Sequence, residues 1–242
     1  MSRANFTDRI TARDVPKMPS EYQELLIRLL TIQADCEVGG PKAYGARWCF
    51  DAPTVDDMIR VTGIIRQELE HFRSFNELLR ELGEDRTDLL WRPSADRYVD
   101  AFRAADAAHW ADVVAFCCLI DRVGQFQVNA MVESSFLPLD DVLPQIIQEE
   151  EGHTRYGTRC LAALAANPAT KPEAQAAVIR WYPRALDMFG RSGSARAERY
   201  IEWGLKQRLN EEARRDYINE VRPVLEGMGL VVPDEGFDRR YV

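Results

Sequence analysis

Histidine and cysteine are scarce in this sequence, which has only three histidines and five cysteines among 242 residues. The cysteines are odd in number and unevenly spaced, without the paired spacings typical of zinc sites. We interpret them as reduced, buried thiols rather than disulfides or zinc ligands. The sequence also lacks an apolar run near the about 20 residues that span a bilayer, and its first residues lack the apolar core of a signal peptide. We therefore expect a cytoplasmic protein without a membrane partner.

Positively charged residues are also fewer than negatively charged ones. The chain carries 31 lysines and arginines against 39 aspartates and glutamates, a net charge of −8, and its acidic residues are spread along its length. Nucleic acids attract proteins with concentrated basic surface, so we expect no nucleic-acid partner. The hydrophobic content of 46% is typical of a globular protein with a substantial core.

Alternating β-branched runs and internal repeats are absent too, and the pattern predicts one helix after another. A capping pattern at Ser20 begins the first helix, which weakens at Gly39-Gly40-Pro41 and either ends there or runs on irregularly for a turn. A second capping pattern at Thr54 begins a helix that stops at Gly83.

Further helices are predicted over about residues 107–134, 139–166 and 170–190, with one or two more within 194–225. No linker composition divides the chain. We therefore expect a single all-α domain over residues 1–242, with residues 1–19 as an extended N-terminal arm and 227–242 as a C-terminal tail.

Two of the three histidines follow a glutamate by three residues, as Glu68 with His71 and Glu150 with His153. On a helix, residues at this spacing project from one face and can bind the same ion. Two such helices, each joined by a carboxylate from a neighbouring helix, form a di-iron or di-manganese site in a four-helix bundle. The pattern predicts a ferritin-like four-helix bundle with additional C-terminal helices.

Asp121 is the expected carboxylate partner of the second motif. Asp121 and Glu150 are equidistant from the turn expected at 134–138, so they lie level in an antiparallel hairpin, each about 21 Å from that turn. A charge in this otherwise apolar segment needs a partner. A metal ion or a salt bridge with Arg122 or Arg66 would supply one, and a role as a helix N-cap is a further alternative.

Glu37 is the expected partner of the first motif, although it fits less neatly. The midpoint between Glu37 and Glu68 falls at residue 52 to 53, whereas the expected loop runs from Gly39 to Pro53. Either the first helix extends past the glycines, or the loop follows the bundle. Asp35 competes for the role, but it points about 160° away from Glu37 on a regular helix.

Six residues make up the predicted metal site, and their oxygen and nitrogen donors suit iron or manganese. We expect two iron ions, with two manganese ions or a mixed iron–manganese pair as the alternative. The metal would react with O2, while the protein fixes the ligands and shapes the pocket. The predicted ligands are Glu37, Glu68, His71, Asp121, Glu150 and His153.

Other polar and aromatic side chains near these positions have two interpretations. Gln33 and Gln125, each one turn from a predicted carboxylate, either orient the ligands or are structural. Four aromatic residues either line a substrate pocket or, as we expect, pack in the core. These are Phe72, Phe75, Phe116 and Phe126.

Several segments together resemble the phenylacetic acid catabolic protein family, over about residues 21–233. Within this family the likeness is to the metal-binding catalytic subunit of an aromatic-ring epoxidase. The segments are Ile120-Asp-Arg-Val-Gly-Gln-Phe-Gln-Val128, Glu133-Ser-Ser-Phe136, Glu149-Glu-Glu-Gly-His153 with Gly157, Gly204-Leu-Lys206, and Val221-Arg-Pro-Val-Leu225 followed by Gly229-Leu230.

The resemblance implies a ferritin-like, non-haem di-iron monooxygenase that epoxidises or hydroxylates an aromatic or acyl substrate, either a coenzyme A (CoA) thioester or a free small molecule. It also implies electrons from a separate NAD(P)H-dependent reductase, and a homo-oligomer or a hetero-oligomer with a paralogous subunit. Two alternatives stay open. One is a metal-free or non-catalytic structural subunit of such a complex, and the other is a di-metal oxidase or peroxide-detoxifying ferritin-like protein.

Overall fold

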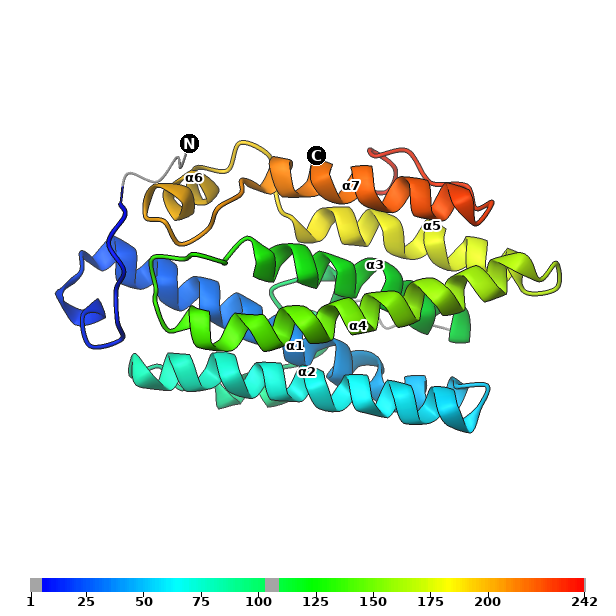
Figure 1. The fold of residues 1–242 in the computed structure, drawn as a ribbon, viewed down its shortest axis with the longest axis horizontal. Helices are drawn as coiled ribbons and strands as arrows, with labels where there is room; N and C mark the ends of the chain where they lie inside the picture. Colours follow the sequence, from blue (N-terminus) through cyan, green and yellow to red (C-terminus); the bar gives the residue numbers. More distant parts are fainter. Residues whose placement is uncertain (1–5, 103–108, 242) are drawn as a thin grey trace. The chain divides into compact units, whose positions relative to one another are not determined.

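The computed structural model describes residues 6–102 and 109–241, and these are helical apart from turns, loops and one isolated bridge. Figure 1 shows the helices in chain order. The all-α class and the helix pairing expected of a ferritin-like bundle are confirmed, and so are the additional C-terminal helices, α5 to α7. The α-helices are α1 (Ser20–Asp51), α2 (Val55–Glu81), α3 (Trp110–Asn129), α4 (Leu139–Ala166), α5 (Lys171–Met188), α6 (Ala195–Glu202) and α7 (Asn210–Gly227).

Two compact units make up the chain. The first contains Met1–Ala105, Met131–Ile146 and Ala195–Gln207, and the second contains Asp106–Ala130, Ile147–Ser194 and Arg208–Val242. The expected single domain with its arm and tail stays a prediction. Within the described ranges, no helix combines the length and the apolar character needed to cross a bilayer.

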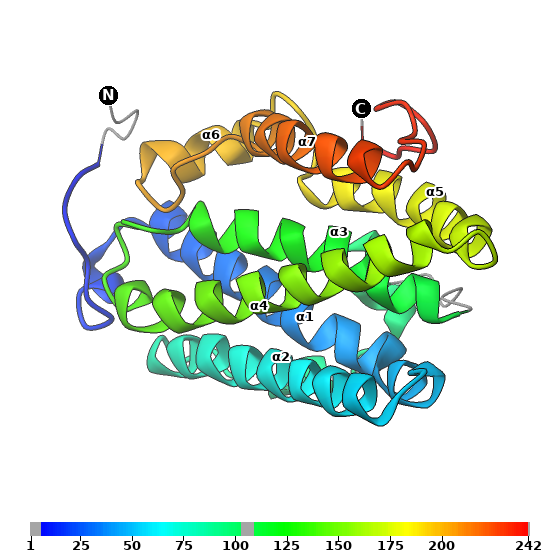
Figure 2. The same ribbon diagram turned by 45° about the vertical axis from the view of Figure 1, so that its right-hand side comes forward.

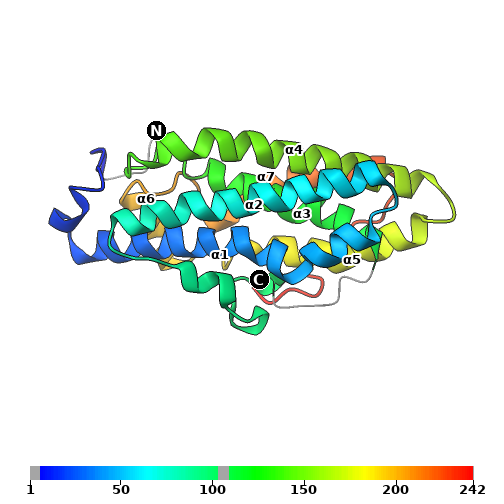
Figure 3. The same cartoon turned by 90° about the horizontal axis from the view of Figure 1, so that it is seen from below.

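Helix α1 pairs with α2 in the first unit (Figure 3). Of the alternatives left open at Gly39-Gly40-Pro41, continuation of the helix is the one observed, and α1 runs further than the single turn expected, without a break to Asp51. A Cβ atom on Gly39 would lie 2.7 Å from Cγ of Phe102, so the glycine leaves room for that ring against the helix. The two helices are therefore joined by only residues 52–54.

The two predicted helix caps differ in outcome. Thr54 caps α2 as expected, since its hydroxyl accepts a hydrogen bond from the Asp57 amide at 3.1 Å. The Ser20 cap was wrong: Pro19 takes the N-cap position, and no side chain caps α1. The Gln23 side chain instead donates to the carbonyl of Met18 at 2.7 Å.

Residues 6–19 are tied to the first unit by backbone hydrogen bonds. The Ile10 amide donates to the Ser135 carbonyl at 2.7 Å, and the Ile10 carbonyl accepts from the Leu137 amide at 2.9 Å. The rings of Phe6, Tyr22 and Trp203 pack against one another. Three short 3-10 turns, Thr87–Trp91 (η2), Ser94–Asp96 (η3) and Asp100–Phe102 (η4), follow α2, and η2 and η4 contact α1.

Helix α3 packs against α5 and α7 in the second unit (Figure 2). It is shorter than expected, since it ends at Asn129 rather than at 134; residues 103–108, which include its expected start, lie outside the described residues. The Phe116 ring meets Trp181 edge-on at 5.3 Å between centroids. Phe126 packs in the same way on Phe189 and Tyr217.

The exposure of the aromatic residues and of the cysteines shows which of them lie in the core. Phe72, Phe75 and Phe116 are at most 6% exposed, which confirms core packing for these rings. All five cysteines are free, as expected. Only the adjacent pair 117–118 is buried, however, while the other three are half-buried, so the prediction of uniformly buried thiols was wrong.

The contact between α1 and α6 gives a pH-dependent prediction. Arg199 and the Trp203 indole both donate to the Glu21 carboxylate, and the arginine bond holds the pKa of Glu21 at about 2, below its ordinary value of 4.5. Because the folded pKa is depressed, the contribution to stability is complete above pH 4.5 and is lost as the pH falls toward 2. Urea unfolding should show Glu21→Gln less stable than the natural chain at neutral pH, and the difference should shrink below pH 4.5. A difference that is constant with pH would contradict this assignment.

Candidate metal centre

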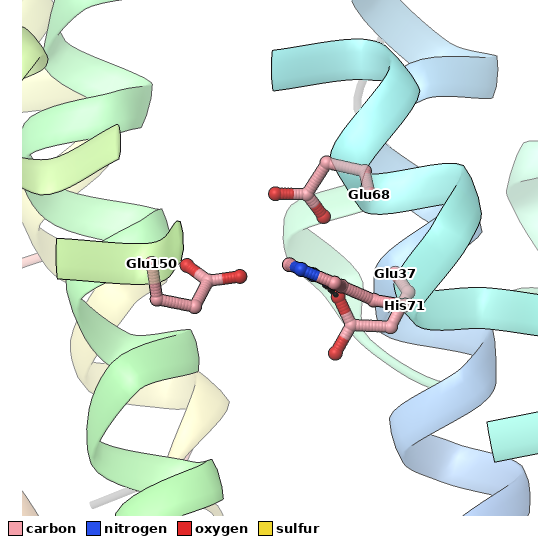
Figure 4. Close-up of side chains that lie close together, drawn as sticks. All are labelled: Glu37, Glu68, His71 and Glu150. Carbon is pink, nitrogen blue, oxygen red and sulfur yellow. Dashed lines mark ion pairs between the residues drawn. The ribbon is translucent and has the colours of Figure 1, made fainter. Parts of the chain in front are cut away.

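In the first unit, α1 and α2 bring three predicted ligands together. Glu37 lies on α1, and Glu68 and His71 lie one turn apart on α2 (Figure 4). Each offers a ligand atom within 4.8 Å of the others, and Nδ1 of His71 is 3.4 Å from Oε2 of Glu37. All three are buried, at 4%, 9% and 2% exposed.

The continuity of α1 explains this geometry. Because α1 runs on to Asp51, the turn at 52–54 coincides with the midpoint between Glu37 and Glu68. The two glutamates are then level in an antiparallel helical hairpin. The mismatch expected from the sequence arose only from the assumed break at Gly39.

Gln33 orients Glu37, as one of the two interpretations predicted. Its side-chain amide donates to Oε1 of Glu37 at 2.5 Å, and it is only 8% exposed. This leaves Oε2, the atom closest to His71, on the side of the other ligands. Gln125 has no matching role, since no hydrogen bond joins it to Asp121 within the described part of the chain.

Asp35, the competing candidate, is engaged elsewhere. Its Oδ1 lies 2.8 Å from Nη1 of Arg97, and its Oδ2 accepts from the Tyr98 amide at 2.9 Å. Both partners of the ion pair are fully buried, with 0% of each residue exposed. Glu37, on the other side of α1, is therefore the carboxylate that joins Glu68 and His71.

In the second unit, α3 and α4 bring the other three predicted ligands together. Oε2 of Glu150 is 3.8 Å from Nδ1 of His153, and Asp121 and His153 offer ligand atoms within 4.8 Å of each other. The three are 3%, 0% and 7% exposed, in the order Glu150, His153, Asp121. Figure 4 shows Glu150 projecting from α4.

The salt-bridge alternative for Asp121 stays a prediction, although both candidate arginines pair with other residues. Arg122 pairs with Glu220 and also donates to Thr158 at 3.0 Å, while Arg66 pairs with Glu70 at 2.6 Å. Both arginines thus have other partners. Asp121 is a buried carboxylate, and its ligand atom lies within 4.8 Å of that of the buried His153.

Two glycines set the approach of α3 to α4 around this triad. A Cβ atom on Gly157, one turn beyond His153, would lie 2.4 Å from the backbone nitrogen of Cys118. The two backbones therefore touch at this point. A Cβ atom on Gly124 would lie 3.4 Å from Oε2 of Glu150, so a larger side chain there would compete with the carboxylate for space.

The negative charge of the α1–α2 triad affects the pKa of the neighbouring Cys36 thiol. Burial raises the pKa of the Cys36 thiol well above its ordinary value, and the charges of Asp35, Glu37 and Glu68 raise it further. Arg97 only partly opposes this effect. A buried group of oxygen and nitrogen donors with excess negative charge fits a divalent cation such as iron or manganese.

Sequence reasoning missed two cations in the first unit, the buried Arg97 and the half-buried Lys206. Arg97 is separated from Asp35 by 62 residues, so no local pattern could reveal their ion pair. Lys206, at the end of the Gly204-Leu-Lys206 segment, also lies near Cys36. Burial lowers the pKa of Lys206 to about 8, and Cys36 opposes this shift.

Comparison with known proteins agrees with the resemblance seen in the sequence. Residues 5–240 match the profile of the phenylacetic acid catabolic protein family. The chain is 28% identical over 222 residues to a subunit of the 1,2-phenylacetyl-CoA epoxidase of Escherichia coli (strain K12), a match that covers 90% of this chain and 71% of the relative. It is 26% identical over 225 residues to benzoyl-CoA oxygenase component B of Aromatoleum evansii, which covers 81% of this chain and 47% of that relative.

The close contact at Gly157 gives a prediction with a matched control. Gly157→Ala forces α3 and α4 apart at the backbone, so it should lower the free energy of unfolding by about 1–3 kcal/mol. Gly63→Ala on α2 meets nothing within 4 Å and should be neutral or slightly stabilising, because alanine favours helix. Urea unfolding of both variants measures the effect. Equal stabilities would show that the helices do not touch at Gly157.

Proposed function

Since this chain belongs to the phenylacetic acid catabolic protein family, we propose that it is the catalytic subunit of a non-haem di-iron oxygenase. The observation that carries the proposal is the pair of buried triads, each with two carboxylates and one histidine. A structural subunit would not need to bury two such acidic groups, because removing carboxylates from water costs stability.

In this proposal the two triads hold two iron ions between them. Four carboxylates neutralise two divalent ions, and the histidines complete a donor set that suits iron or manganese and leaves positions open. The bound iron pair would supply the activation of O2. The proposed ligands are Glu37, Glu68 and His71 from the first unit, and Asp121, Glu150 and His153 from the second.

The protein's own residues contribute position and an apolar setting. The Gln33 amide fixes the carboxylate plane of Glu37 by its hydrogen bond to Oε1. Gly157 and Gly124 let α3 and α4 approach closely enough for Asp121 and His153 to meet. The low exposure of every ligand excludes bulk water, which strengthens electrostatic interactions within the site.

The relatives suggest the substrate class. Both are named for CoA thioesters of aromatic acids, phenylacetyl-CoA and benzoyl-CoA. We propose that this chain adds one oxygen atom of O2 to the ring of an aromatic acyl-CoA, with the other oxygen leaving as water. That reaction consumes two electrons and two protons, so a separate NAD(P)H-dependent reductase must supply the electrons. A paralogous subunit is the proposed oligomeric partner.

Metal analysis tests the ligand assignment. Protein produced with ample iron should contain about two iron ions per chain. Glu68→Gln/His71→Ala and Glu150→Gln/His153→Ala should each lose at least one of them, because each removes two donors from one triad. Glu151→Gln, on the exposed side of α4, should retain both. Two manganese ions would favour oxidase or peroxide chemistry, and metal-free natural protein would favour a structural subunit.

An isotope experiment tests the reaction. Iron-loaded protein with a suitable reductase should convert benzoyl-CoA or phenylacetyl-CoA to a product that carries one oxygen atom from ¹⁸O2. The corresponding free acids should react more slowly, and the Glu150→Gln/His153→Ala variant should give no labelled product. Consumption of O2 with release of hydrogen peroxide alone, on every substrate tried, would contradict the oxygenase assignment.

A further inference from the structure

The hydroxyl group of Thr154 on α4 is buried without a hydrogen-bond partner in the described part of the chain. The residue is only 5% exposed. A threonine or serine inside a helix can donate to the carbonyl oxygen four residues earlier, as Thr62 and Ser74 do on α2 at 2.8 Å and 3.1 Å. Thr154 does not, and an unpaired buried hydroxyl costs stability. Valine would fill the same volume without this cost, so the hydroxyl of Thr154 is a candidate for a role other than packing.

Thr154 belongs to the layer of the second unit that carries three proposed metal ligands. It follows Glu150 by one helical turn on the same face of α4, and it comes directly after His153. The close approaches of α3 and α4 at the two glycines described above set the register of these helices. Counting from them places Thr154 level with Asp121 on α3.

A second threonine connects this layer with the surface of the unit. Thr158 lies one turn beyond Thr154 on the same side of α4, and it is half-buried. Its hydroxyl oxygen accepts a hydrogen bond from Nη2 of Arg122 at 3.0 Å and lies 3.5 Å from Sγ of Cys118. Burial thus increases from Thr158 to Thr154 and is complete at His153, which is 0% exposed.

Arg122 orients the hydroxyl group of Thr158. Its Nε donates to the carbonyl of Cys118 at 3.1 Å, and its Nη1 pairs with Glu220, whose side chain is 48% exposed. A guanidinium group stays protonated and only donates, so it occupies a lone pair of the Thr158 oxygen and leaves the hydroxyl proton for another acceptor. Sulfur is a weak acceptor, so Cys118 does not hold that proton firmly. Glu220 offsets the positive charge, which would otherwise repel an incoming proton.

The burial of the ligands creates a need for such a group. Asp121, Glu150 and His153 are at most 7% exposed, so bulk water does not surround them. An electron added to a buried site is stabilised when a proton enters with it, because the added charge is poorly solvated there. Hydroxyl groups can pass protons, since each can donate one hydrogen bond while it accepts another.

We propose that Thr158 and Thr154 relay protons from surface water to the proposed metal ligands of the second unit. The inference rests on the proposed function, in which each turnover consumes two protons together with two electrons. Oγ1 of Thr154 gives its proton toward the ligands and takes one from Oγ1 of Thr158. An ordered water bridges the two, because Cβ atoms one turn apart are separated by about 5–6 Å. Thr158 takes its replacement from surface water, so neither hydroxyl keeps a net charge.

Proton uptake on reduction tests the relay without substrate or O2. Iron-loaded, oxidised protein in weak buffer is reduced anaerobically with a small chemical reductant, and a pH-indicator dye follows proton uptake by stopped flow. Thr154→Val should slow the uptake by about tenfold or more, because the inner hydroxyl is lost. Thr154→Ser retains a hydroxyl and should stay within about threefold of the natural chain.

Thr31→Val is the matched control. Thr31 on α1 is also 5% exposed, and its hydroxyl also lacks a hydrogen-bond partner among the described residues. It lies about 120° around α1 from Glu37, so this variant should take up protons at the natural rate. Thr158→Val should slow the uptake as well, and it decides the question if Thr154→Val fails to hold iron. Valine has nearly the shape and helix propensity of threonine, so urea unfolding should show no loss of stability in any valine variant.

A natural rate of proton uptake in an iron-containing Thr154→Val or Thr158→Val variant would overturn the inference, and so would equal slowing in Thr31→Val. During turnover, Thr154→Val should also show a larger solvent deuterium isotope effect than the natural chain, because proton transfer then limits the rate. Natural protein that takes up protons on reduction but gives no labelled product would contradict the proposed oxygenase and not the relay. The two failures are therefore distinguishable.

Discussion

Burying a carboxylate away from water costs several kcal/mol unless a cation or a set of hydrogen bonds compensates it. Asp35 shows one solution, because Arg97 and the Tyr98 amide satisfy it within the protein. Glu37 has one amide donor, from Gln33, and two further ligands as its neighbours. Asp121 and Glu150 are buried carboxylates as well, next to the buried His153. Bound metal ions would compensate the cost of burial at both places, and the other features of the fold serve to hold these groups together.

The helices hold the buried carboxylates together, and only a few positions need a particular residue such as glycine. Each triad lies on two neighbouring helices of one unit, one of which carries a glutamate and a histidine one turn apart. Glycine appears where helices or rings approach closely, as at Gly157 against Cys118 and Gly39 against Phe102. Larger side chains at these points would separate the elements that carry the ligands.

The local parts of this architecture could be predicted from the sequence. The spacing of Glu68 with His71 is a property of one helix, and counting from the turns was enough to select Asp121. Contacts between distant segments could not be predicted from sequence patterns. Gly39-Gly40-Pro41 looks like a helix end, but α1 continues through it and Phe102 packs on Gly39.

The hydrogen-bond partners of the buried polar residues also divide into those that a local sequence pattern predicts and those that it does not. Gln33 and Gln125 have the same spacing from their carboxylates, yet only Gln33 forms the expected hydrogen bond. The partners of Asp35 lie more than 60 residues away and lack a local signal.

The central claim is that both triads bind one pair of metal ions. X-ray absorption at the iron edge, on protein loaded with two ferrous ions per chain, tests it most directly. The expected result is an iron–iron distance of about 3.5–4 Å with only oxygen and nitrogen in the first coordination shell. Isolated iron without a metal neighbour, or a sulfur ligand such as Cys36, would contradict it.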